Sequence, residues 1–175
     1  MPSVSWDRAY VSDDDKMRLV IALARGNVDH ETGGPFGAAV FERDGGRLVS
    51  VGVNTVVTSH NAMLHAEIVA CMLAQARVRS YTLSAPDLPQ HDLAASCAPC
   101  AMCLGAVLWS GVRRIVYGAS RDDAVDCGFD EGPVFPESYT YLTSRGMAFI
   151  GDVRRDEARA VLDTYNRRGG TLYNG

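Results

Sequence analysis

One histidine, one glutamate and two cysteines have the types and spacing of a catalytic metal site. They stand in a His-x-Glu triplet at residues 65–67 and a Pro-Cys-x-x-Cys run at residues 99–103. Cys100 and Cys103 lie three residues apart at the start of a predicted helix, so both sulfurs share one face and can reach one ion. The first turn of a helix also favours thiolates. With His65 they supply three protein ligands, which leaves the fourth position of a tetrahedral zinc ion open for water.

Glu67 is two residues from His65, too close to be an obvious fourth ligand but well placed to meet a metal-bound water. Zinc lowers the pKa of such a water toward about 7, so hydroxide is available at neutral pH. The combined pattern of His-x-Glu and Pro-Cys-x-x-Cys is the one known from zinc deaminases of nucleobases. In that chemistry the hydroxide attacks the amino-bearing ring carbon. Glu67 is expected to move the proton to the ring nitrogen and to help the amine leave as ammonia.

Other interpretations of these residues stay open. A Cys-x-x-Cys pair alone also suits a redox site or half of a structural zinc site. A non-catalytic zinc-binding module is a further alternative, and the presence of Glu67 argues against it. Cys97 extends the cysteine run, but it precedes Pro99 and the helix, so we expect it to point elsewhere.

The remaining cysteines and histidines have ordinary expectations. Five cysteines, an odd number in a chain without a secretory start, favour metal binding or free thiols over disulfides. Cys71 and Cys127 are expected to be buried. His30, His60 and His91 lie near predicted turns and are expected at the surface.

Composition limits the class of partner. The 175 residues include 17 basic and 21 acidic side chains, a formal net charge of −4. Because polynucleotide binding depends on a basic surface, this balance favours a small, weakly charged ligand and no nucleic acid. No segment approaches the roughly 20 apolar residues that cross a bilayer, and the first residues lack the basic start and apolar run of a secretory signal. We expect a cytoplasmic protein with no membrane partner.

The predicted elements alternate between helices and strands. Helices are expected at 12–26, 65–77 and 100–110, with a last one whose apolar face holds Ala158, Val161, Leu162 and Tyr165. Strands are expected at 36–43, 47–53, 92–96, 114–119 and 147–151, the first two forming a hairpin around the turn at 44–46. This order predicts an α/β fold with three layers, α/β/α, around a central mixed sheet. No linker divides the chain, so residues 1–175 are expected to form a single domain.

The chain resembles the cytidine deaminase-like superfamily, and within it the bacterial guanine deaminases and their ammeline-accepting relatives. The resemblance covers about residues 33–132 and extends more weakly to the C-terminus. It rests on the segments at 33–38 (Gly-Gly-Pro-Phe-Gly-Ala), 65–67, 96–106 and 128–131 (Gly-Phe-Asp-Glu), and on Asn54 after the second strand. It implies a five-stranded sheet flanked by helices, one zinc ion per subunit and a homodimer.

The resemblance also implies how a base is held. The rings of Phe36 and His65 are expected to stack on its two faces, the Asn54 amide to hydrogen-bond its ring, and the Ala66 backbone N–H to bind a carbonyl or ring nitrogen. Phe36 could equally be a core residue, and Asn54 could simply favour a turn.

Two positions concern specificity and closure. Glu131 falls where guanine deaminases place an acidic residue against the amino-bearing edge of the purine, where it can also assist proton transfer; its alternative is a solvated loop charge. A carboxylate suits adjacent N–H donors, which guanine offers and adenine does not. In the relatives a C-terminal aromatic residue of the partner subunit caps the pocket, and Tyr173 is the matching candidate here. Trp109 is expected to pack its helix behind the site. The segment 139–145 departs from the family pattern.

The expected activity is zinc-dependent hydrolysis of a free nucleobase, with guanine giving xanthine and ammonia, and with ammeline as a further substrate. Deamination of cytosine, another triazine or a nucleoside is the alternative. A tRNA adenosine deaminase would need a basic docking face, for which Arg167 and Arg168 are too few.

Overall fold

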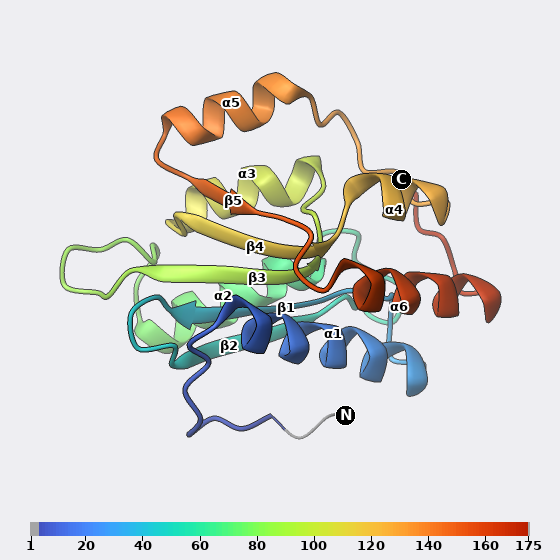
Figure 1. Cartoon of the computed structure of the whole chain (residues 1–175), viewed down its shortest axis with the longest axis horizontal. Coiled ribbons are helices and arrows are strands. Elements are labelled where there is room, and N and C mark those ends of the chain that lie inside the picture. Colours follow the sequence, from blue (N-terminus) through green and yellow to red (C-terminus); the bar gives the residue numbers. More distant parts are fainter. Residues whose placement is uncertain (1–3, 175) are drawn as a thin grey trace.

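A five-stranded sheet lies at the centre of the computed structural model, which describes residues 4–174 (Figure 1). The strand order is β2-β1-β3-β4-β5. The strands are β1 (Gly37–Glu42), β2 (Leu48–Val53), β3 (His91–Cys97), β4 (Arg114–Ala119) and β5 (Ala148–Ile150). β1 pairs antiparallel with β2 and β3, whereas β3, β4 and β5 run parallel. The predicted mixed sheet is therefore confirmed.

Helices cover both faces of the sheet, which confirms the three-layer α/β/α architecture (Figure 1). α1 (Asp13–Asp29) and α6 (Arg155–Arg167) pack on one face, and α2 (Ala66–Val78) and α3 (Ala101–Ser110) on the other. Two shorter helices, α4 (Arg121–Asp126) and α5 (Pro136–Ser144), join β4 to β5. None of the helices between residues 4 and 174 combines the length and the apolar character that a bilayer crossing requires.

The start of α1 follows the sequence, but its end does not. Ser12 caps the helix by accepting a hydrogen bond from the Asp15 N–H at 3.0 Å. The predicted end at Gly26 is wrong, because the helix continues to Asp29. A glycine costs a helix only about 1 kcal/mol, and here the extra turn buries Val28 in the core.

Three further expectations fail where tertiary contacts override local signals. His91 is 2% exposed instead of lying at the surface, and its ring Nδ1 bonds to the Leu83 carbonyl at 2.9 Å. Trp109 is 83% exposed, so it does not pack behind the site. No helix or strand is predicted between residues 120 and 146, yet residues 136–144 form α5, which starts with Pro136 at a favoured first-turn position.

A buried ion network joins α1 to the sheet. Asp92 at the start of β3 is 1% exposed. Its carboxylate accepts from Lys16 at 2.8 Å, from Arg43 at 2.8 Å and from Arg114 at 3.0 Å. Lys16 is itself buried, so this is a charge pair inside the core. The network lies at the end of β3 opposite to Cys97, away from the zinc motifs.

The elements that carry the chemistry meet at one end of the sheet. β3 and β2 end there and β1 begins there, because β1 is antiparallel to both. The starts of α2 and α3 point to the same end. α2 packs directly against β2: a Cβ built on Gly52 would lie 2.3 Å from the Ala66 carbonyl oxygen. A residue larger than glycine at this position would therefore push away the first turn of α2.

Candidate active site

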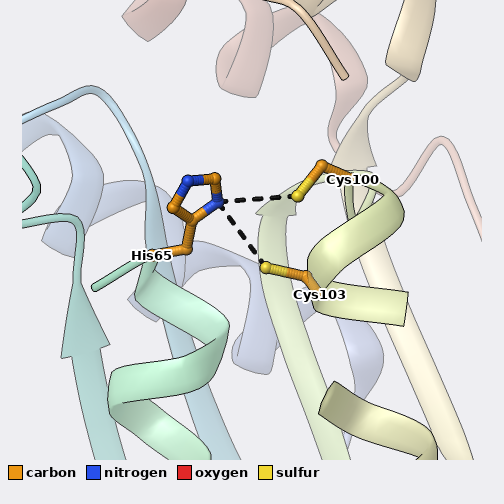
Figure 2. Close-up of side chains that lie close together, drawn as sticks. All are labelled: His65, Cys100 and Cys103. Atoms are coloured by element: carbon orange, nitrogen blue, oxygen red, sulfur yellow. Dashed lines mark hydrogen bonds between the residues drawn. The ribbon is translucent and has the colours of Figure 1, made fainter. Parts of the chain in front are cut away.

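The three expected metal ligands converge at the starts of α2 and α3 (Figure 2). His65 and Cys100 are the residues immediately before the two helices, and Cys103 lies in the first turn of α3. The His65 Nδ1 atom is 3.6 Å from the Cys100 sulfur and 3.6 Å from the Cys103 sulfur. Tetrahedral zinc, with bonds of about 2.3 Å to sulfur and about 2.0 Å to nitrogen, needs a nitrogen–sulfur separation of about 3.5 Å. The side chains therefore fit zinc in both chemistry and spacing.

The two ligand thiols differ in their ease of ionisation. Hydrogen bonding from Cys103, helped by His65, lowers the pKa of Cys100 to about 4. The pKa of Cys103 is raised, because it donates to the Cys100 thiolate and is buried.

The other nearby cysteines are not part of the cluster. Cys97 points away from it, as the sequence predicts, and its sulfur lies 3.5 Å from the Ser120 carbonyl oxygen. Burial raises the pKa of Cys71 to about 12, which makes it an inert core thiol.

Glu67 lies in the first turn of α2 and lines the cavity beside the ligands. Its side chain is almost fully buried. Burial, reinforced by the negative charge of Cys100, raises the pKa of the Glu67 carboxyl to about 7. A carboxyl with this pKa can both accept and return a proton near neutral pH.

Glu131 faces the same cavity from the segment that follows α4. It is 7% exposed, so the alternative of a solvated loop charge is wrong. Its carbonyl accepts from the Ala101 N–H at 3.0 Å, which ties this segment to the first turn of α3. Burial raises the pKa of the Glu131 carboxyl to about 8, and the negative charges of Cys100 and Glu67 act in the same direction.

The cavity is small and lined by both polar and aromatic groups. Its free volume is about 30 Å³, enough for one or two water molecules. The lining residues that the sequence singles out are Phe36, His65, Glu67, Cys100, Glu131 and Tyr173. Ala98, Phe129, Asp130 and Asn174 also line it and have no predicted role. Phe129 stands in a motif that the sequence does highlight, and its aromatic type is the signal that could have identified it.

Asn54 and Ala66 lie behind this lining and are fully buried. The Asn54 side-chain oxygen accepts from the Val56 N–H at 3.2 Å. Among residues 4–174, the buried Asn54 side-chain nitrogen has no hydrogen-bond partner. Ala66 is the first residue of α2, where a backbone N–H has no acceptor within the helix. Both groups are thus donors available at the base of the site.

Tyr173 fills much of the space between these groups. Its ring centroid lies 6.2 Å from that of His65 and 5.4 Å from that of Phe129. Asn174 anchors the tail by donating to the Gly128 carbonyl and accepting from the Asp130 N–H, at 2.8 and 2.9 Å. The tail of the single chain therefore lies over its own pocket. The expected tail segment runs to Gly175, which lies outside the described residues.

Comparison with known proteins agrees with this geometry. The family model described as "Cytidine and deoxycytidylate deaminase zinc-binding region" matches residues 11–119. The chain belongs to this family. It is a deaminase with a zinc cofactor, and His65, Cys100 and Cys103 are the residues arranged to hold the ion.

The similar proteins include guanine deaminases and tRNA-specific adenosine deaminases. Guanine deaminase of Bacillus subtilis is 35% identical over 121 residues, which cover 69% of this chain and 73% of the relative. The tRNA-specific adenosine deaminase of Rickettsia bellii is also 35% identical, over 66% of this chain and 81% of the relative. The solved structure of guanine deaminase from Nitrosomonas europaea is 44% identical, with a TM-score of 0.88, and the match covers 91% of this chain and 87% of that one.

Proposed function

We propose that this protein hydrolyses the amino group of a free nucleobase, and that guanine is its substrate. Guanine and water would give xanthine and ammonia. The observation that carries the proposal is the buried carboxyl of Glu131, which faces the zinc ligands across a cavity with aromatic walls. A buried carboxyl needs hydrogen-bond partners, and the adjacent N–H groups on the amino-bearing edge of guanine would favour its ionised form. The guanine deaminases among the similar proteins support this choice.

The residues of this chain have distinct tasks in the proposed reaction. Zinc, when bound, supplies water of lowered pKa for hydrolysis. Glu67 would take one proton of that water and pass it to the ring nitrogen, and would then pass the second proton of the same water to the leaving amine, so that ammonia departs. Glu131 accepts from the amino-bearing edge and assists the second proton transfer.

The remaining site residues hold the base. Phe36 and His65 stack on its two faces. The Asn54 side-chain nitrogen and the Ala66 N–H donate to a ring nitrogen or carbonyl oxygen. Tyr173 closes the pocket, and it must move aside for entry, because the free volume is far below that of a purine.

Several finer features belong to the same proposal. Residues 1–175 act as a single deaminase domain in the cytoplasm, a reducing compartment that suits the five free cysteines. The protein is a homodimer. Support comes from an exposed apolar face on the adjacent helices α2 and α3, where Met72, Leu73 and Trp109 are 54%, 52% and 83% exposed.

Ammonia release tests the substrate. Zinc-loaded protein should act on guanine in preference to cytosine, guanosine and adenosine, with ammeline as the second base to measure. Glu67→Gln should lose turnover by about 100-fold or more while its zinc content stays the same. Release from adenosine or tRNA, but not from guanine, would favour the tRNA adenosine deaminase alternative. The net charge of −4 argues against that alternative.

A further inference from the structure

Asn27 is a fully buried polar residue that belongs to neither zinc motif. It lies in the last turn of α1, on the opposite layer of the molecule from α2 and α3. Burying an amide is costly unless each of its polar atoms is hydrogen-bonded. Its partners therefore indicate what the residue does.

The side chain of Asn27 joins two separate backbone segments. Its amide nitrogen donates to the Gly34 carbonyl at 2.8 Å and to the Asn54 carbonyl at 2.7 Å. Its amide oxygen accepts from the Thr32 hydroxyl at 2.7 Å. Both N–H groups and the oxygen are thus used, and the orientation of the amide follows from these three partners.

The two segments that Asn27 joins carry the groups proposed to hold the base. Phe36 follows Gly34, and its N–H donates to the Gly34 carbonyl at 2.9 Å. The Asn54 N–H in turn donates to the Phe36 carbonyl at 3.1 Å. The segments touch so closely that a Cβ built on Gly33 would lie 1.9 Å from the Asn54 carbonyl oxygen.

We propose that Asn27 is a positioning residue for the substrate base: it fixes the backbones that carry Phe36, which would stack on the base, and Asn54, which would donate to it, relative to each other. Asn27 acts through the backbones of Gly34 and Asn54 and does not touch the base. This inference rests on the proposed function for its catalytic consequence. Its structural part, that the Asn27 side chain holds the segments of Gly34 and Asn54 together, does not depend on the proposed function.

The test compares Asn27→Asp with Ser110→Ala in zinc-loaded protein. Aspartate keeps the shape of asparagine but has no N–H groups for the two carbonyls. Ser110 is also buried and bonds to the Val107 carbonyl at 2.7 Å, at the end of α3 away from the ligands. Hydrogen exchange of the Phe36 and Asn54 amides should accelerate about tenfold or more in Asn27→Asp and stay unchanged in Ser110→Ala. KM for the base should rise about tenfold with kcat changed less than about twofold.

A milder pair of variants guards against loss of folding. Thr32→Val removes the hydroxyl that orients the Asn27 amide, whereas Thr32→Ser retains it. Thr32→Val should accelerate the exchange of the Phe36 and Asn54 amides and raise KM, each by less than Asn27→Asp does. Thr32→Ser should behave as the parent protein. Unchanged exchange at Phe36 and Asn54 in both Asn27→Asp and Thr32→Val would overturn the proposal, as would a fall in kcat with KM unchanged. If the parent protein deaminates no base, the proposed function fails. The hydrogen-exchange result still shows whether Asn27 holds the two segments together.

Discussion

The carboxyl of Glu131 is the group on which the proposed choice of base depends. Glu131→Gln keeps its size but turns one acceptor into a donor that opposes the amino-bearing edge of guanine. A hydrogen bond to a charged group contributes about 1.5–3 kcal/mol. We therefore expect kcat/KM for guanine to fall about 10–150-fold, measured by ammonia release. Zinc content should not change.

Glu137→Gln is the matched control for this prediction, because Glu137 lies exposed on α5. Equal guanine kinetics in the parent and in Glu131→Gln would show that Glu131 has no role in substrate binding or catalysis.

At the scale of residues, the sequence predicts chemistry well where residue type and spacing act together. The zinc ligands are found from two short motifs, whereas Asn27 has no local signal, since its partners lie up to 27 residues away.

At the scale of elements, the contact of α2 with β2 at Gly52 sets the place of His65. Gly52→Ala adds a methyl group where the Ala66 carbonyl already lies, so the first turn of α2 must shift. Overpacking of this kind costs about 1–3 kcal/mol. We expect a lower melting temperature and weaker zinc binding in competition with a chelator. Gly45→Ala, in the open hairpin turn, should change neither, and equal zinc affinity in Gly52→Ala would contradict the prediction.

The elements themselves are predictable where periodicity and flanking residues agree. β4 has the predicted bounds, and Gly111 ends α3 with φ of 92°, a conformation that suits glycine. The sequence does not predict the helix α5, because its residues, mostly polar, have no clear apolar period and only Leu142 among them is buried. His91 shows the same limit: it is buried and its ring bonds to the carbonyl of Leu83, eight residues earlier in the chain, and no sequence pattern indicates this contact.

At the scale of the whole molecule, the Asp92 network links stability to pH. Burial raises the pKa of Asp92, but hydrogen bonds from Lys16 and Arg43 lower it more, so its folded pKa lies below the ordinary value. A depressed carboxyl pKa stabilises the fold above the unfolded pKa of about 4. That contribution is lost as pH falls from about 4 through the folded pKa. Urea unfolding between pH 7 and pH 2 should show this loss.

Asp92→Asn is the variant that isolates the effect. It leaves Lys16 as an unpaired charge in the core, so we expect a loss of about 3–5 kcal/mol at pH 7 and a flatter response to acid. The exposed Asp44→Asn should retain the parent profile. If Asp92→Asn and the parent lose stability in parallel below pH 4, other carboxyls account for the acid response.

Trp109 tests the proposed dimer. Trp109→Glu places a charge in the apolar face of α2 and α3, so the protein should sediment as a monomer where the parent sediments as a dimer. Tyr81→Glu offers a control, since Tyr81 is 91% exposed and lies outside these helices. A monomeric parent protein would contradict the homodimer directly.

The position of Tyr173 has a consequence for the affinity of this protein for a base. If a base binds in this cavity as proposed, Tyr173 occupies part of the volume that the base needs, so only the molecules with an open tail would be ready to bind. The observed dissociation constant is the intrinsic one divided by the open fraction. If about one molecule in a hundred is open at a given moment, binding appears about a hundredfold weaker than the contacts alone would give.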